Sequence, residues 1–371
     1  DLHLTKDCVL VARHNPWLSD NTNITEVAKT NAAVAARQRT VPGVLVNVKY
    51  SLATYGGPAQ YLSDLTNPAD PRSVLKSLVV DGEDHTGDWS ITDFTVAELK
   101  QWIGGTTYDA RNERPTALNG RYPVLTMQEV IDIAKKGTAD TGRTIGIIPE
   151  TKHPSYFQSI GLPLEQKLVD ALNANGYIGK DAPVIVQSFE VANLKALHKL
   201  TNVRLVQLTD ANDVLANGVL DYNQPEDFVL NGDKRTYGDL LTPTGLAEIA
   251  TYADAIGPWK RSIVSGAFVD KNGDGKPDDL DGDGRITDAD RVALAPTSLI
   301  SDAHRAGLLV TPYTFRNEYF YLLSDYGGNP INEYKKFFAL GVDGLFSDFA
   351  DTAVAGLAAT VPEPAALAVF G

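Results

Sequence analysis

Cysteine is nearly absent from this sequence, since Cys8 is the only one among 371 residues. A single cysteine excludes an intrachain disulfide framework and a metal site built on several thiolates. It is compatible with either a cytoplasmic or a periplasmic protein. Long apolar runs are absent as well, and we therefore predict no membrane span within this sequence.

Positive charge is also scarce, with 33 Lys and Arg against 47 Asp and Glu and a net charge of −14. Nucleic acids and acidic membranes both attract basic faces, so this balance argues against either as a partner. Hydrophobic residues make up 43% of the chain, which is enough to bury one large core or two smaller ones. Nothing in the sequence indicates the oligomeric state.

Both ends of the sequence resemble cut ends. Asp1 opens directly in strand-like alternation, without an initiator Met or a signal peptide, and we interpret the chain as a fragment or processed form. Val361-Pro-Glu-Pro364 and the apolar residues after it resemble the start of a bacterial PEP-CTERM sorting signal. An ordinary linker explains this segment equally well. The sorting signal would place the parent protein in the envelope of a Gram-negative bacterium.

Regular alternation of strands and helices begins at Pro123. Capping-box patterns at Thr95–Glu98 and Thr126–Glu129 predict two helix starts, and Gly137 is expected to end the second helix. Repeated units of short apolar strands and helices imply a parallel sheet covered by helices. Because the units are many and a Gly-rich dinucleotide fingerprint is missing, we predict an α/β TIM (β/α)8 barrel. The other predicted elements are residues 144–152, 164–176, 183–189, 191–200, 203–208, 255–257, 299–304, 308–313 and 343–348.

We predict one barrel domain over residues 1–355, followed by a linker or sorting-signal remnant at 356–371. Residues 18–122 are rich in Asn, Gly, Asp and Thr and show weak periodicity, so they are expected to form an insertion or small subdomain. A second insertion is expected at 266–292.

The segment Thr144–Lys152 carries a carboxylate, Glu150, and an ammonium, Lys152, near its end. Residues i and i+2 of a strand share a face, so Glu150 and Lys152 should point to the same side. Taken alone, this pair is explained equally well by a surface salt bridge. In a barrel the chemistry lies at the C-terminal ends of the strands. The residues expected there are Asp1, His14, Glu150, Lys152, 187–189, 311–316 and 347–348.

This set of side chains suits a hard cation. Two carboxylates, a histidine and a lysine without any thiol favour Ca²⁺ or Mg²⁺. The cation would polarise a phosphate while His14 moves protons. The remaining histidines lack matching partners and are expected to have no role in the chemistry. They are His85, His153, His198 and His304.

Six segments in the same order resemble motifs of one known family, the glycerophosphodiester phosphodiesterases. They include Asp1-Leu-His-Leu-Thr-Lys-Asp7 with Val9–Asn15, and Gly146-Ile-Ile-Pro-Glu150-Thr-Lys152-His-Pro154, followed by 186–189, 252–258, 310–316 and 344–348. The likeness is closest to the periplasmic glycerol-phosphodiester branch and covers nearly the whole chain outside the two insertions. It implies a TIM barrel that hydrolyses a small-molecule glycerophosphodiester to an alcohol and sn-glycerol 3-phosphate.

The resemblance also implies roles for individual residues. Asp1 matches the Asp of a Glu-x-Asp metal pair, and Glu150 matches a later metal-binding Glu. His14 matches the second of two acid/base histidines, and Lys152 matches a lysine that contacts phosphate. Three aromatic residues are expected either in the core or in a pocket wall that packs on the substrate, namely Phe189, Tyr313 and Phe315.

Two parts of the family pattern have no counterpart in this sequence. They are a His-Arg motif on the first strand and the Glu two residues before Asp1. His3 cannot replace either, because it follows Asp1 at the wrong spacing. We therefore expect a barrel that lacks its first strand and part of the second.

The second insertion contains two acidic repeats. Oxygen-bearing side chains stand at positions 1, 3 and 5 of each repeat with Gly at position 6, and the second repeat has Asp at position 12. This spacing resembles an EF-hand-like or dockerin-like calcium loop, which favours a periplasmic or extracellular protein. The alternative is an acidic surface loop. The predicted ligands, for one or two Ca²⁺ ions, are Asp270, Asn272, Asp274, Asp279, Asp281, Asp283 and Asp290.

Two other functions fit parts of this pattern. A non-catalytic, calcium-binding surface or adhesion module could be built on a degenerate barrel. A phospholipase D-like or phosphatidylinositol-cleaving barrel would share the paired histidines and the metal. The segments 150–154 and 313–316 favour the glycerophosphodiesterase branch.

The missing motifs generate a prediction about rate. Each absent metal carboxylate, acid/base group or phosphate-binding Arg typically contributes about 10²–10⁴-fold. We therefore expect residues 1–371 alone to release glycerol 3-phosphate from glycerophosphocholine with Ca²⁺ several powers of ten more slowly than a chain extended to include these motifs. Equal rates from the two chains contradict the prediction.

Overall fold

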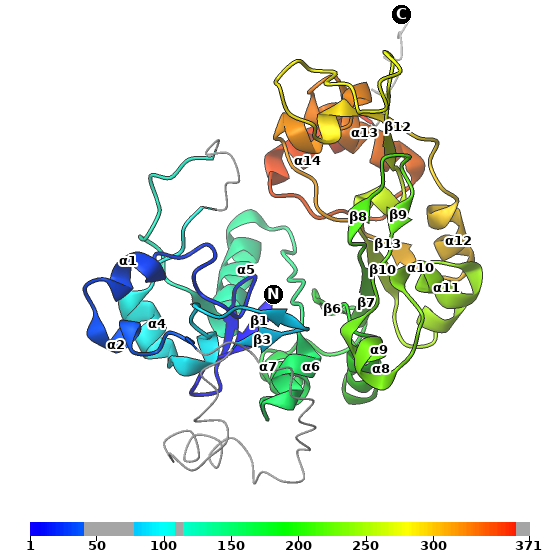
Figure 1. The fold of residues 1–371 in the computed structure, drawn as a ribbon. Coiled ribbons are helices and arrows are strands. Elements are labelled where there is room, and N and C mark those ends of the chain that lie inside the picture. Colours follow the sequence, from blue (N-terminus) through cyan, green and yellow to red (C-terminus); the bar gives the residue numbers. More distant parts are fainter. Residues whose placement is uncertain (41–77, 108–113, 361–371) are drawn as a thin grey trace, which may run out of the picture. The chain divides into compact units, whose positions relative to one another are not determined.

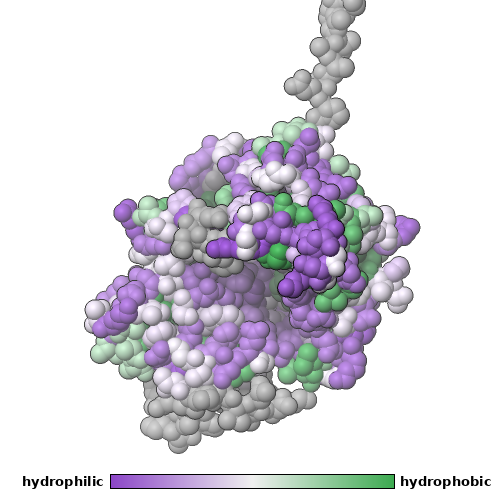
Figure 2. Space-filling model, turned by 45° about the horizontal axis from the view of Figure 1, so that its top comes forward, coloured by the Kyte–Doolittle hydropathy of each residue, from purple (hydrophilic) through white to green (hydrophobic). Residues whose placement is uncertain are grey.

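The computed structural model describes residues 1–40, 78–107 and 114–360, which belong to two compact units, Asp1–Leu205 and Val206–Gly371 (Figure 1). The expected sorting-signal segment at 361–371 lies outside the described residues. Hydrophilic side chains cover much of the visible face (Figure 2). Within the described ranges, no helix combines the length and the apolarity needed to cross a bilayer. One barrel domain over 1–355 stays a prediction.

The first unit begins with a hairpin, in which the start of the first strand lies beside the end of the second. Strand β1 (Leu2–Leu4) pairs antiparallel with β2 (Leu10–Ala12), which pairs in turn with β5 (Leu125–Thr126). The strand-like alternation at the start of the sequence thus corresponds to β1. The Arg13 N–H donates to the Asp1 carbonyl at 3.0 Å. Asp1 and the residues after β2 therefore lie side by side.

The predicted strand 144–152 forms through isolated bridges and not as a continuous strand. Parallel bridges join Ile147 to Val184, Glu150 to Gln187, and Leu2 to Thr151. Pro149 has no N–H to donate, which interrupts the ladder immediately before Glu150. The segment still lies between β1 on one side and β6 (Ile185–Ser188) on the other.

Capping boxes start two helices of the first unit as predicted. The Thr95 and Glu98 pair opens α4 (Val96–Trp102), and the Thr126 and Glu129 pair opens α5 (Met127–Thr141). The predicted end of α5 at Gly137 is wrong, because the helix runs on to Gly142. That glycine has a φ of 68°, a left-handed conformation that suits a helix C-terminus.

The other elements of the first unit are short. They are α1 (Ile24–Ala28), α2 (Ala32–Ala35), β3 (Val79–Val80), β4 (Glu83–Asp84), the 3-10 helix η2 (Ile91–Asp93), α6 (Pro154–Ser159), α7 (Glu165–Ala174) and α8 (Val191–Leu200). The predicted element at 164–176 contains α7, and its Leu164, Leu168 and Leu172 are fully buried.

Parallel strands followed by helices also form the second unit. Strand β10 (Ala255–Pro258) lies between β7 (Arg204–Thr209) and β13 (Leu309–Val310), parallel to both. Residues 343–348 were predicted as a strand but contribute one bridge, between Phe315 and Ser347. The helices are α9 (Glu226–Asn231), α10 (Tyr237–Leu240), α11 (Pro243–Ile249), α12 (Leu299–Arg305), α13 (Pro330–Leu340) and α14 (Ala350–Ala358).

The acidic segment is an excursion from the second unit. Strands β11 (Gly266–Phe268) and β12 (Arg291–Ala293) pair antiparallel at its base. The remaining short elements are the strands β8 (Asp213–Val214) and β9 (Leu220–Asp221) and the 3-10 helices η3 (Lys260–Ser262), η4 (Asp288–Asp290), η5 (Tyr319–Tyr321) and η6 (Ser324–Tyr326).

Buried charges join the excursion to the end of β10. The Lys260 ammonium donates to Glu333 at 2.8 Å, and the fully buried Arg261 donates to Asp288 at 2.8 Å. Burial lowers the pKa of Lys260, although the Glu333 carboxylate opposes that change. Because Asp288 opens η4 at the end of the acidic segment, this network attaches the segment to the sheet.

A histidine cluster ties the first insertion to the end of the Glu150 segment. His153 Nδ1 lies 2.5 Å from Asp81 Oδ2, and both residues have left-handed backbones, with φ of 50° and 48°. Trp17 stacks on His85 with ring centroids 3.7 Å apart, and it lies 6.1 Å from the His153 ring. The buried His3 ring stacks on His153 with ring centroids 6.2 Å apart. This cluster holds the residue that follows Lys152.

Substitution of Asp81 tests this attachment. Glycine and asparagine both tolerate the left-handed backbone, but only asparagine keeps an oxygen for the His153 N–H. We expect Asp81→Gly to lower the free energy of unfolding in urea by about 1–3 kcal/mol and Asp81→Asn to lower it less. Asp140→Asn, in an exposed ion pair with Lys136, is the control and should change it by less than about 0.5 kcal/mol. Equal losses for the two Asp81 variants contradict the assignment.

Candidate active site

Glu150 is a buried carboxylate with an unused oxygen. Its residue is 4% exposed, and its Oε1 atom has no hydrogen-bond partner among the described residues. The Lys152 ammonium lies 3.8 Å from that oxygen. The predicted placement of both side chains on one side is therefore confirmed. An ordinary exposed salt bridge does not describe this pair, because the Glu150 side chain is 5% exposed and the Lys152 side chain is 13% exposed.

Asp1 lies level with Glu150 on the neighbouring strand. The Leu2 N–H donates to the Glu150 carbonyl at 2.8 Å, and the bridge from Leu2 to Thr151 continues this register. Residues one position back on both segments, Asp1 and Glu150, therefore share a face. The Asp1 side chain is 18% exposed and reaches within 4.0 Å of His14 Nε2.

His14 offers a neutral ring nitrogen beside these carboxylates. The Lys152 ammonium lies 3.4 Å from His14 Nε2, a long hydrogen bond in which the lysine donates to the unprotonated ring nitrogen. Burial by surrounding atoms and the positive charge of Lys152 lower the pKa of His14 to about 4, against the opposing charge of Glu150. The side chain nevertheless keeps 63% of its surface exposed. His14 is thus unprotonated and accessible, as a general base requires.

Lys152 stands at the centre of the group. Its ammonium contacts Glu150 and His14, as described above, and lies 5.6 Å from the ring centroid of Phe189. A partly buried cation held in this way is suited to an anionic oxygen of a phosphate. The structure therefore brings together five residues expected from the sequence, namely Asp1, His14, Glu150, Lys152 and Phe189.

His3 has a structural position. It is fully buried, and its Nε2 lies 3.3 Å from the His14 carbonyl. Burial keeps the pKa of His3 well below its ordinary value, with the neighbouring His153 adding to the effect. A neutral, enclosed ring bonded to the backbone of His14 orients that residue, and it agrees with the expectation that His3 replaces neither missing group.

The other two aromatic residues of the prediction belong to the second unit. Phe315 is fully buried against Tyr334 and Phe337, with ring centroids 5.3 Å and 4.8 Å away. Phe315 therefore lies in the core and not in a pocket wall, the other position that the sequence allows. Tyr313 is half-buried, and its hydroxyl donates to the Thr209 carbonyl at 3.0 Å.

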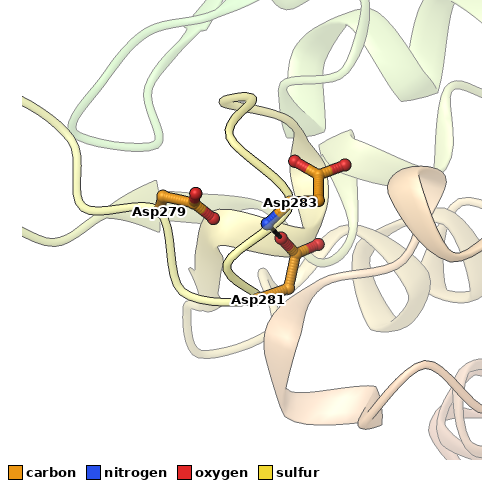
Figure 3. A group of neighbouring side chains, drawn as sticks. All are labelled: Asp279, Asp281 and Asp283. Carbon is orange, nitrogen blue, oxygen red and sulfur yellow. Dashed lines mark hydrogen bonds between the residues drawn. The ribbon is translucent and has the colours of Figure 1, made fainter.

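Three neighbouring carboxylates lie on one loop of the acidic excursion, the segment between β11 and β12 (Figure 3). Asp279, Asp281 and Asp283 are exposed, and one oxygen of each lies within 4.8 Å of the others. Backbone N–H groups of Gly284 and Gly282 donate to Asp279, and they lower its pKa. Ionised oxygens in this arrangement can hold a cation.

The remaining predicted loop ligands are engaged by backbone groups. Asp290 is buried, and its two oxygens accept the N–H groups of Leu280 and Thr287 at 2.7 Å each. In the first repeat Asp270 accepts three backbone N–H groups, and Asn272 donates to Asp274 at 3.3 Å. The structure therefore gathers only part of the predicted ligand set.

Sequence reasoning missed the surroundings of Lys152. His153 lies beside the site, as its place after Lys152 in the sequence indicates, but the packing of His85, Asp81 and Trp17 around it is not evident from the sequence. The positive φ values of Asp81 and His153 give no signal in the sequence. His304 pairs with Asp343 at 2.9 Å in the second unit and is structural there.

Comparison with known proteins identifies relatives along most of the chain. The sequence profile of the Glycerophosphoryl diester phosphodiesterase family matches residues 1–352. Glycerophosphodiester phosphodiesterase GDPD6 of Arabidopsis thaliana is 30% identical over 304 residues, which cover 78% of this chain and 70% of the relative. A glycerophosphodiester phosphodiesterase of Haemophilus influenzae is 23% identical over 286 residues, covering 72% and 70%.

A solved glycerophosphodiester phosphodiesterase from Agrobacterium tumefaciens aligns with 96% of this chain and 84% of its own, at 10% identity and a TM-score of 0.45. The family match and the parallel strands with their helices confirm the α/β, (β/α)8 class expected from the sequence. The enzyme class predicted from the motifs is confirmed by the family match and by the named relatives. This chain belongs to the Glycerophosphoryl diester phosphodiesterase family.

Proposed function

We propose that this chain hydrolyses glycerophosphodiesters to an alcohol and sn-glycerol 3-phosphate at the site formed by Asp1, His14, Glu150 and Lys152. The observation that carries the proposal is the unpartnered, buried oxygen of Glu150 beside a neutral histidine and a lysine. The family match supports the reaction class. The geometry described above supports the roles proposed for the individual residues.

A divalent cation fits the two carboxylates. A buried carboxylate oxygen without a hydrogen bond is costly unless a ligand completes it. Asp1 and Glu150 offer only oxygen donors, and these suit Ca²⁺ or Mg²⁺. Asp1 and Glu150 would hold the cation, which when bound polarises a phosphoryl oxygen.

The protein's own groups would perform the remaining tasks. The unprotonated Nε2 of His14 can take a proton from a water or hydroxyl, or return it to the leaving oxygen once charged. Lys152 can attract the phosphate and neutralise charge on its oxygens as the bond breaks. The Phe189 ring, 5.6 Å from the Lys152 ammonium, helps to keep it near this position.

We further propose that catalysis by residues 1–371 alone is weak. His14 is the histidine that reaches the carboxylates among the described residues, while His3 is enclosed and bonded to a backbone carbonyl. A site with a single accessible imidazole has no second group to protonate the leaving oxygen while the first removes a proton.

Three substitutions test the proposed roles. We expect His14→Asn and Glu150→Gln each to lower calcium-dependent release of glycerol 3-phosphate about 10²–10⁴-fold, since they remove proton transfer and a cation ligand. Lys152→Met should weaken binding of glycerol 3-phosphate at least about 10-fold. His198→Asn, at an exposed position on α8, is the matched control and should keep the parent rate.

Release can be followed with radiolabelled glycerophosphocholine at high enzyme concentration, so that a slow parent rate remains measurable. If Glu150→Gln and His14→Asn both keep the parent rate, the proposal is wrong. Calcium binding without any turnover in the parent chain supports the alternative, a non-catalytic calcium-binding surface module.

We also propose that the acidic excursion binds Ca²⁺ through Asp279, Asp281 and Asp283. Support comes from their convergent oxygens and from the left-handed glycines at 282 and 284, which allow the sharp turn. The Tyr319 hydroxyl donates to Asp283 at 2.6 Å and anchors the loop to the unit. A calcium-dependent loop of this kind suits the periplasm or the cell exterior, which is where we place the protein.

Substitution of a loop carboxylate should reduce calcium binding. We expect Asp283→Ala to remove one Ca²⁺ per chain in isothermal titration calorimetry and to reduce the rise in Tm that Ca²⁺ produces. Tyr319→Phe removes the hydrogen bond to Asp283 without removing a carboxylate and should keep the full stoichiometry. Unchanged stoichiometry and unchanged calcium stabilisation in Asp283→Ala contradict the proposal.

A further inference from the structure

Gln187 lies beside Glu150 at the end of β6. A parallel bridge pairs the two residues, the Gln187 N–H donates to the Pro149 carbonyl at 2.9 Å, and the Thr151 N–H donates to the Gln187 carbonyl at 3.0 Å. Both backbone groups of Gln187 are thus tied to the segment that carries Glu150. Its position relative to that carboxylate is set by the backbone.

The Gln187 side chain points to the same face as Glu150. The bridge between Ile147 and Val184 has the same register, so the pairing is consistent along the segment. Continued by two residues, this register pairs Lys152 with Phe189, and the ammonium does lie 5.6 Å from that ring centroid. Paired residues of neighbouring strands direct their side chains to one face of the sheet.

The row continues to Asp1 on the other side. The register of the bridge between Leu2 and Thr151 places Asp1 level with Glu150. Asp1, Glu150 and Gln187 therefore form one row across three neighbouring segments, and adjacent strands in a sheet lie about 4.8 Å apart. A cation bound to oxygens at about 2.4 Å can span two such neighbours.

Two oxygens of this row lack hydrogen-bond partners. Gln187 is 7% exposed and Glu150 is 4% exposed, and Oε1 of each has no hydrogen-bond partner among the residues that the structure describes. Buried polar atoms in folded proteins are nearly always partnered. Two unpartnered oxygens on neighbouring strand ends indicate a ligand that takes oxygen donors, and side-chain amide oxygens are ordinary ligands of Ca²⁺.

We propose that the Gln187 amide oxygen binds the same cation as Asp1 and Glu150. This inference rests on the proposed function and adds a neutral ligand to the two carboxylates. Because the amide carries no charge, the bound divalent cation keeps more of its attraction for a phosphate anion than it would beside a third carboxylate. Gln187 would then affect cation affinity directly and the chemistry only through the cation.

Calcium titration of Gln187 variants tests the inference. The titrations use a chain carrying Asp274→Ala and Asp281→Ala, so that the acidic excursion does not contribute. We expect Gln187→Leu to weaken Ca²⁺ binding at least about 10-fold, and Gln187→Glu to bind as tightly as the parent or more tightly. Gln207→Leu, at another buried glutamine, in β7, is the control and should leave the affinity unchanged. Circular dichroism and Tm in EDTA establish that each variant is folded.

The outcomes separate this inference from the proposed function. If Glu150→Gln abolishes calcium binding while Gln187→Leu keeps the parent affinity, Gln187 is not a ligand and the proposed function stands. If Glu150→Gln also keeps the parent affinity, no cation binds at Asp1 and Glu150. That result contradicts both the proposed function and the role of Gln187 as a ligand. If Gln187→Leu does not fold, Gln187→Met decides, because it removes the amide oxygen and keeps an unbranched side chain of similar length. Parent affinity in that variant overturns the inference.

Discussion

Backbone pairing on both sides of the Glu150 segment determines where the reactive side chains lie. The Leu2 N–H donates to the Glu150 carbonyl, and on the other side Gln187 exchanges backbone hydrogen bonds with the same segment. A shift of one residue in either pairing would turn a carboxylate or amide to the opposite face of the sheet. Leu2 and Thr151 are buried on that opposite face, so the shift would also expose apolar surface. The site therefore depends on register more than on any single ion pair.

One lysine places a positive charge beside this row. Lys152 lies near a buried carboxylate, a neutral imidazole and an aromatic ring, and each contact suits a positive charge. Burial lowers the pKa of His14 most, and the same ammonium lowers it further, so the cationic group that would attract a phosphate also helps to keep the base unprotonated. Substrate binding and proton transfer are thus linked through one side chain. The cluster around His153 holds the backbone that carries it.

Local patterns predicted much of this arrangement. The spacing of Glu150 and Lys152 indicated a shared face, and two capping boxes located helix starts, because each of these signals lies within four residues. The contact between Asp81 and His153 joins residues 72 apart and depends on two left-handed backbones, which no local pattern reveals. The position of Gln187 depends on strand register, and Phe315 became a core residue because Tyr334 and Phe337 enclose it. Such contacts are set by tertiary packing.

The central claim is that Asp1, Glu150 and their neighbours form a cation-dependent phosphodiester site. A crystal structure of this chain with Ca²⁺ and sn-glycerol 3-phosphate tests it most directly through the anomalous scattering of calcium. The account predicts an anomalous peak about 2.4 Å from Glu150 Oε1, with a phosphate oxygen in contact with both the ion and the Lys152 ammonium. A structure in which calcium occupies only the loop at residues 270–290, with the phosphate away from Lys152 and His14, would contradict it.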